Sequence, residues 1–137
     1  MTPPHTPPET DATARVRTAA DVLNEARRLI VEKGWTQNAY ARRDDGDPCN
    51  EDDQYAVCFC ASGALYAASW RVAGSQYATD IRDTARQFLR RAIGGAHVPQ
   101  WNDNPSRSAS EVLAAFDRAI ELAASTPRTQ SESEVGG

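Results

Sequence analysis

Two cysteines separated by one residue, Cys58 and Cys60, open the small and apolar stretch VCFCASGALYAASW. A thiol at the start of a helix is acidified by the helix dipole and by the unpaired N–H groups of the first turn. A cysteine nucleophile also needs a base, usually a histidine that an asparagine or aspartate orients. The chain offers one such candidate catalytic set: Cys60, His97, Asn102 and Asp103.

A buried and unreactive role for the same thiols is the stronger expectation. Free cysteine is among the most buried residue types, and almost any chain contains a cysteine, a histidine and an asparagine that can be written as a triad. We therefore expect Cys58 and Cys60 to be small core residues at the entrance to a buried helix. A small cysteine-dependent enzyme with Cys60 as nucleophile is the first alternative to a non-enzymatic domain.

A metal site would have to use the three cysteines and His97. Structural zinc sites pair their cysteines as C-x₂₋₄-C, whereas Cys49, Cys58 and Cys60 are spaced C-x₈-C-x-C. A disulfide between Cys49 and Cys58 would require an oxidising compartment, for which the sequence gives no signal. We therefore expect no metal and no other cofactor.

The acidic run between Asp44 and Asp53 does not fit a calcium loop. If Gly46 took the place of the invariant glycine, Ala41 and Arg43 would stand at ligand positions. A solvated turn is the better interpretation of this run.

Arginines gather in the segment RDTARQFLRR, residues 82–91. A charged stripe opposite an apolar stripe is usually the wet face of an amphipathic helix. The chain has a net charge of −4 and a pI of about 5.1, which argues against nucleic acid as a partner, since phosphate binding needs a basic face. A module that binds an acidic partner is the second alternative, through Arg82, Arg86, Arg90 and Arg91.

The segment QWNDNP combines a tryptophan with short polar side chains. We expect Trp101 to fill the core at a helix junction. Side chains such as Asn102 and Asp103 accept hydrogen bonds from backbone N–H groups, and a buried helix needs its first N–H groups satisfied. They are therefore expected to cap the helix that begins near Cys60, or to brace the loop after Trp35. A polar pocket beside Cys60 is the functional alternative.

Four helices are predicted to position these residues, and the outer two have the clearest ends. The first runs from a cap at Thr18 to Gly34, with an apolar stripe at helical spacing. The last begins at Ser108, which forms a capping box with Glu111, and ends at Thr126.

The two inner helices are predicted over about residues 60–73 and 77–93. The first of these is apolar on every side, Trp70 included, and is therefore expected to be buried at the centre of the fold. Its Gly63 and neighbouring alanines are small enough to let another backbone approach closely. Gly74 ends this helix.

The fold expected is mainly α, a small four-helix domain over residues 18–125 between disordered tails at 1–17 and 126–137. The long connection before Cys60 can hold a short β-hairpin within 39–59, with 39–42 paired to 55–59. No apolar run approaches a membrane span, and the N-terminus lacks the features of a signal peptide. We therefore expect a cytoplasmic protein with reduced thiols.

The order of four segments resembles a family of short, uncharacterised bacterial and phage proteins that is classed as a domain of unknown function. These segments are GWTQNAYARRDDG, VCFCASGALYAA, WND and SEVLAAFDRAIELA. The family's Gly-Trp-Thr-Gln, Cys-x-x-Gly-Ala-Leu and Trp-Asn-Asp elements fall here on residues 34–37, 60–65 and 101–103, and the resemblance extends over 18–124. It implies no activity, substrate or cofactor. It implies that Cys60 and the Trp-Asn-Asp segment belong to one shared feature, to which His97 does not belong.

A non-enzymatic binding or accessory module is therefore the function we expect, with a ligand that the sequence does not specify. A binding module needs a pocket or an exposed apolar patch. The cysteine enzyme needs an accessible thiol of low pKa with a base in reach. The arginine-faced module needs arginines that have no partner within the chain.

Overall fold

The computed structural model describes residues 11–126, and for residues 11–17 and 75–77 it describes the backbone alone. The elements in chain order are α1 Asp11–Lys33, β1 Ala41–Arg42, β2 Pro48–Cys49, β3 Cys58–Phe59, α2 Ala61–Ala92, α3 Val98–Asn102 and α4 Ala109–Ala124. This confirms a small, mainly α-helical domain that carries a short sheet.

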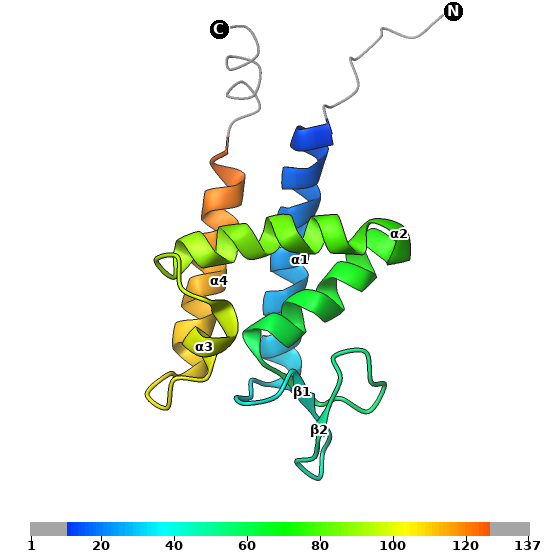
Figure 1. The fold of residues 1–137 in the computed structure, drawn as a ribbon, viewed down its shortest axis with the longest axis vertical. Coiled ribbons are helices and arrows are strands. Elements are labelled where there is room, and N and C mark those ends of the chain that lie inside the picture. Colours follow the sequence, from blue (N-terminus) through cyan, green and yellow to red (C-terminus); the bar gives the residue numbers. More distant parts are fainter. Residues whose placement is uncertain (1–10, 127–137) are drawn as a thin grey trace, which may run out of the picture.

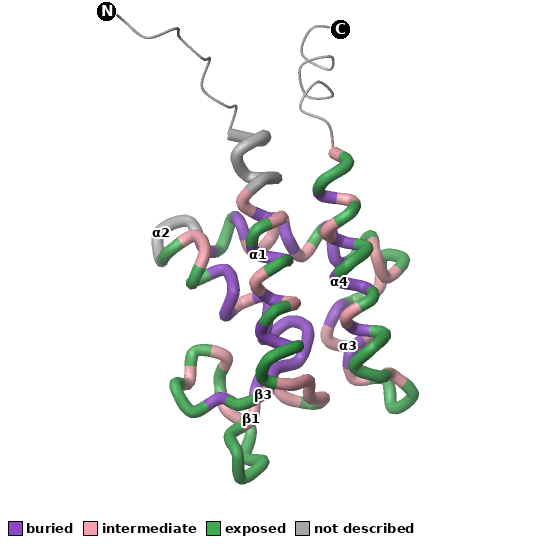
Figure 2. Tube along the Cα trace, turned by 180° about the vertical axis from the view of Figure 1, so that it is seen from behind, coloured by how far each residue is buried: buried purple, intermediate pink, exposed green. Residues whose placement is uncertain are grey.

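The helices α1 and α4 lie side by side and run in opposite directions, and α2 bends across both of them (Figure 1). The short sheet and its loops lie at the carboxyl end of α1. Buried residues gather where α1, α2 and α4 face one another, and the loops around the sheet are mostly exposed (Figure 2). Phe116 of α4 is the largest of the fully buried side chains.

Helix α1 begins at Asp11, seven residues before the predicted start, so the expectation of a tail over 11–17 is wrong there. The segment DATARVR contains alanine and arginine and no proline or glycine, and such residues extend a helix once it has formed. Thr18 therefore lies inside the helix and not at its N-cap. The tails expected over 1–10 and 127–137 lie outside the described residues. The carboxyl end of α1 is as predicted: Gly34, at φ 114°, donates its N–H to Ile30 O at 2.8 Å.

The two predicted inner helices are the two arms of α2, and they meet at a kink. Gly74 has φ 72° and ψ 179°, a conformation open to glycine and costly for other residues. The first arm buries Leu65 and its alanines other than Ala73, but Trp70 keeps 51% of its surface exposed. The expectation that this arm is apolar and buried all round is therefore wrong at Trp70.

The linker expected after α2 contains a further short helix, α3, which begins at Val98 and carries a proline in its first turn. Proline is tolerated there because the N–H groups of the first turn have no partner within the helix. The helix α4 has the predicted capping box: Ser108 accepts from the N–H of Glu111, and the Glu111 carboxylate accepts from the N–H of Ser108.

The sheet has the strand order β2-β1-β3 and is antiparallel. The pairs Ala41↔Phe59 and Arg42↔Cys58 confirm the expected pairing of the segments around β1 and β3. The strand β2 was not predicted. It forms because Gly46, at φ 88°, allows a tight turn in which Arg43 N donates to Asp47 O at 2.9 Å.

Gly63 is the point where the backbone around the sheet touches α2. Cys60 N donates to Tyr40 O at 3.0 Å. A Cβ atom placed at Gly63 would overlap that same carbonyl oxygen and lie 2.8 Å from its carbon. Because the obstacle is backbone, a side chain at this position would force the sheet away from the helix.

Gly63→Ala should therefore destabilise the domain by about 3 kcal/mol, the upper end of the usual cost of overpacking a tight contact. Gly46→Ala is the matched control, since its Cβ meets nothing within 4 Å and the strain of its positive φ costs only ~1 kcal/mol. Urea unfolding followed by circular dichroism measures both. Equal losses for the two variants would show that the contact at Gly63 is not tight.

Candidate functional site

Cys60 is the N-cap of α2 and is 5% exposed. Its Sγ accepts a hydrogen bond from Gly63 N at 3.2 Å. Burial raises the pKa of this thiol to about 11, and it outweighs the opposing effect of the N–H groups of Ser62 and Gly63. The helix start therefore holds a neutral thiol at physiological pH, which is the opposite of an activated nucleophile.

The other members of the candidate catalytic set do not complete a triad around this thiol. His97 is exposed at the start of α3. Within residues 11–126, no hydrogen bond joins His97 to Cys60 or to Asn102. Asp103 Oδ1 accepts instead from Asn38 N at 2.8 Å and from Asn102 Nδ2 at 3.0 Å. The structure brings Asn102 to the first turn of α2 and leaves the histidine outside this network.

Asn102 is fully buried and uses both ends of its amide. Oδ1 accepts from Trp35 Nε1 at 2.7 Å and from Ala61 N at 2.9 Å. Nδ2 donates to Thr36 O at 3.2 Å and to Asp103 Oδ1 at 3.0 Å. Asn102 thus makes both of the contacts that the sequence offered as alternatives, the cap of the central helix and the brace of the loop after α1.

Two polar side chains that sequence reasoning did not single out reinforce the junction that Asn102 forms between the loop after α1, the start of α2 and α3. Gln37 Nε2 donates to the carbonyl oxygens of Asn102 at 3.0 Å and Asn104 at 2.7 Å. Arg42 donates to Thr36 Oγ1, to Gln37 O and to Gly46 O, all at 2.8–2.9 Å. The loop between α1 and the sheet is therefore tied to α3 on one side and to the β1–β2 turn on the other.

The other candidate residues of this region have structural neighbours of their own. The indole of Trp101 is partly buried against the core, and the Arg107 guanidinium lies 4.0 Å from its ring centroid. Cys49 and Cys58 are free thiols. They stand on strands that β1 separates, so their Cα atoms are about 9–10 Å apart by strand spacing, too far for a disulfide. Burial raises the pKa of the Cys49 thiol.

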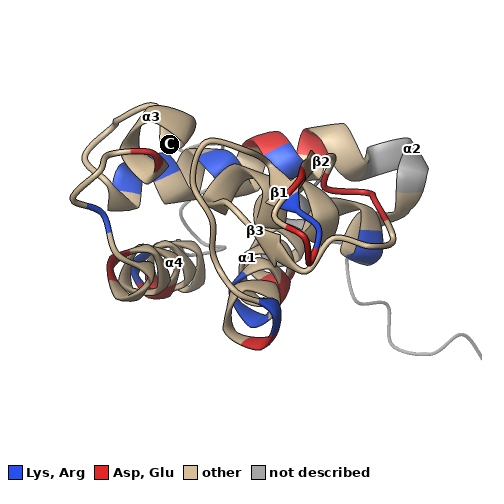
Figure 3. Ribbon diagram, turned by 90° about the horizontal axis from the view of Figure 1, so that it is seen from below, with Lys and Arg blue, Asp and Glu red and all other residues tan. Residues whose placement is uncertain are grey.

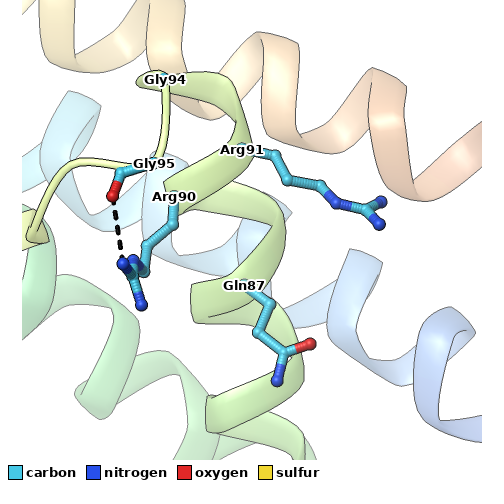
Figure 4. Close-up of a pocket in the computed structure, with 5 residues that line it drawn as sticks. All are labelled: Gln87, Arg90, Arg91, Gly94 and Gly95. Carbon is cyan, nitrogen blue, oxygen red and sulfur yellow. Dashed lines mark hydrogen bonds between the residues drawn. The ribbon is translucent and has the colours of Figure 1, made fainter.

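The four arginines of the predicted basic face all have partners within the chain. The Arg82 guanidinium lies 4.6 Å from the centroid of the Tyr66 ring, and Arg86 forms an ion pair with Asp83 at 3.0 Å. Figure 4 shows the remaining two, which line an open hollow of about 440 Å³ with Gln87, Gly94 and Gly95.

This hollow is a poor anion site. Arg90 donates to Gly95 O at 3.0 Å, and Arg91 lies 5.7 Å from the Phe88 ring centroid. The N–H groups of Gly94 and Gly95 donate to carbonyl oxygens of the last helical turn. The hollow lies at the carboxyl end of α2, where the helix dipole repels anions and cations stabilise the helix. Arg90 and Arg91 therefore have a structural role, because their positive charges stabilise the carboxyl end of α2.

A second hollow, of about 200 Å³, lies beside Trp70 and is more enclosed. The carboxyl end of α1, the loop 51–56 and the first arm of α2 form its walls. We name it the Trp70 cleft, and its lining residues are Lys33, Glu51, Asp52, Asp53, Gln54, Ala56, Phe59, Ala67, Trp70 and Arg71. Sequence reasoning missed it because Trp70 was assigned to a buried helix. The available signal was that Tyr66 and Trp70, four residues apart, both carry polar atoms that suit a wet helix face.

Asp53 orders the loop that forms one wall of the cleft. Its Oδ2 accepts from Arg43 at 2.6 Å and its Oδ1 accepts from Tyr55 N at 2.8 Å. Asp53 N donates to Asn50 O and Ala56 N donates to Asp53 O, both at 3.1 Å. The Arg43 guanidinium holds the pKa of the Asp53 carboxyl below its usual range. The wall is therefore formed before any ligand arrives.

Charges of both signs surround the cleft. Acidic and basic segments alternate around β1 and β2 in the view of Figure 3. Arg71 lies 3.5 Å from Glu25, which also pairs with Arg28. Among the described residues, Lys33, Glu51 and Asp52 make no ion pair and no side-chain hydrogen bond, so their charges are open to a ligand.

The pKa of Cys60 gives a prediction about its reactivity. Iodoacetamide should modify Cys60 at pH 8 only as the protein unfolds, and all three cysteines should react alike in denaturant. The folded pKa of about 11 lies above the ordinary pKa of a cysteine thiol, 9.0. Stability from this group is therefore complete below pH 9 and is lost as the pH rises from 9 to about 11. Mass spectrometry measures the extent of iodoacetamide modification at each of the three cysteines. Fast modification of Cys60 in the folded protein at pH 7 would contradict the prediction that this thiol is buried and neutral.

Comparison with known proteins gives a family but no activity. No curated protein and no solved structure matches the chain. None of the helices within residues 11–126 is long and apolar enough to cross a membrane. The model of a family of unknown function, DUF6197, matches residues 14–122, which is most of the chain and includes the whole of the network around Asn102. The resemblance drawn from the sequence is confirmed: the chain belongs to this family of unknown function.

Proposed function

We propose that this domain is a non-enzymatic binding module and that the Trp70 cleft is its contact site. The observation that carries the proposal is a tryptophan that is 51% exposed at the edge of a partly enclosed hollow, on a helix arm whose leucine, Leu65, is fully buried. Covering the exposed half of an indole would contribute about 2–3 kcal/mol, from ~100 Å² of apolar surface. Tryptophan is also the residue type most enriched among binding hot spots.

The walls of the cleft support the same proposal because they are rigid. One wall is a helix packed into the core, and the other is a loop that Asp53 orders through four hydrogen-bonded contacts. Ligand sites are largely formed in advance, since ordering a mobile loop on binding lowers affinity.

A row of aromatic side chains extends the surface beyond the cleft. The rings of Tyr40 and Tyr66 lie 5.6 Å apart, and Tyr66 precedes Trp70 by one helical turn. The neighbouring Tyr66 and burial raise the pKa of Tyr40, and the charge of Glu51, which lines the cleft, adds to this effect. Tyr40 is 45% exposed. A partner can therefore contact the tyrosines and the cleft together.

The alternatives fit less well. A cysteine enzyme with Cys60 as nucleophile would need an accessible thiolate, and this thiol is buried with a raised pKa. An arginine-faced module would need arginines without partners, and all four have one. The free thiols of Cys49, Cys58 and Cys60 fit a reducing compartment, and we place the protein in the cytoplasm as part of this proposal.

Small organic fragments test the proposal, because they collect at binding hot spots whatever the natural ligand is. Titration of a set of neutral aromatic and heterocyclic fragments, followed by ¹H–¹⁵N NMR, should shift the Trp70 indole signal and the amides of residues 51–56. Trp70→Ala should abolish these shifts with little loss of stability, since the side chain is half exposed.

Val31→Ala is the matched control, because Val31 is 56% exposed and does not line the cleft. It should leave the fragment shifts unchanged. Fragments that gather at the hollow around Arg90 and Arg91, or shifts that survive Trp70→Ala, would overturn the assignment of the site.

A further inference from the structure

We propose that the Trp70 cleft binds a positively charged side chain, an arginine or a lysine, that a partner protein presents. The proposal rests on the proposed function, since it names the ligand of that same cleft. Its chemistry is a cation held between the face of an indole and carboxylates of the loop 51–56.

The balance of charge in the cleft favours a cation. Of its five charged lining residues, Asp53 is neutralised by Arg43 and Arg71 is paired with Glu25. Glu51 and Asp52 contribute −2 and Lys33 contributes +1, which leaves −1. The whole chain carries −4, and its field adds to the attraction of a basic partner. An anion in the cleft would face these carboxylates.

Trp70 lacks the cation that arginines of the chain place over several other aromatic rings of the fold. Arginines of the chain cover Trp101 at 4.0 Å, Tyr66 at 4.6 Å and Tyr55 at 5.9 Å from the ring centroids. No such arginine or lysine covers Trp70 within the described part of the chain, although Lys33 and Arg71 line the same cleft. Indole binds cations better than the other aromatic rings do. The face of the Trp70 indole is therefore free to bind a cation from a partner.

An organic cation fits better than a metal ion. No group of three His, Cys, Asp or Glu residues within the described ranges lies close enough to hold a metal. Asp53, the most ordered carboxylate of the loop, already has both oxygens occupied, by Arg43 and by Tyr55 N. The flat indole and two separate carboxylates match instead the extended shape of an arginine or lysine head group.

Three capped tripeptides test the proposal: Ac-Gly-Arg-Gly-NH₂, its citrulline analogue, which has the same shape without the charge, and Ac-Gly-Glu-Gly-NH₂. NMR titration at low salt should show the arginine peptide shifting the Trp70 indole and the amides of residues 51–54. Its affinity should exceed that of the citrulline peptide at least fivefold, and it should fall as salt is added.

Charge variants give the matched control. Glu51→Gln with Asp52→Asn should weaken the arginine peptide at least fivefold. Asp44→Asn with Asp80→Asn changes the net charge equally at exposed positions outside the cleft and should change the affinity less than twofold. Equal losses in the two double variants would overturn specific recognition.

The failure of this inference differs from the failure of the proposed function. One outcome is that neutral fragments shift the NMR signal of the Trp70 indole, while the arginine peptide binds no better than the citrulline or glutamate peptide. The proposal of a cationic ligand is then overturned, and the proposal that the cleft is the binding site stands. If neither fragments nor peptides reach Trp70, both proposals are overturned.

Discussion

The structure depends on one buried amide. Asn102 accepts from the indole of Trp35 and from the first N–H group of α2, and it donates to the loop after α1. A buried polar side chain is tolerated only when its hydrogen bonds are made, and removing it would leave several buried partners without one. The ends of α1 and α3 and the start of α2 are thereby held in one arrangement, and the sheet is placed between them.

The same junction explains why the thiol at its centre is an unpromising nucleophile. Gly63 lets the backbone of Tyr40 lie against the first turn of α2, and this closes Cys60 off from water. Desolvation then raises the pKa of the thiol more than the helix start lowers it. At the surface, the loop 51–56 and Trp70 leave a charged hollow, and this is the site at which we propose that the domain binds its partner.

The sequence predicted what local pattern controls. The capping box at Ser108, the glycine stop at Gly34 and the pairing of the segment around β1 with that around β3 are all present. Long-range packing decided the rest. Helix α3 forms where a linker was expected, and Trp70 faces solvent because only part of α2 can be covered by α1 and α4 in so small a domain. An apolar sequence shows that a helix packs against the hydrophobic core. It does not show which face of the helix remains exposed to solvent.

The most direct measurement of the central claim is the free energy of unfolding of Asn102→Ala, with Asn104→Ala as its control. Asn104 is exposed, and among the described residues its side chain accepts from Ser106 N alone. Loss of Asn102 leaves an indole N–H and a helix N–H without their partner, so we expect a destabilisation of about 3 kcal/mol, against about 0.5 kcal/mol for the exposed control. If the two variants unfold at the same urea concentration, Asn102 does not hold the junction together.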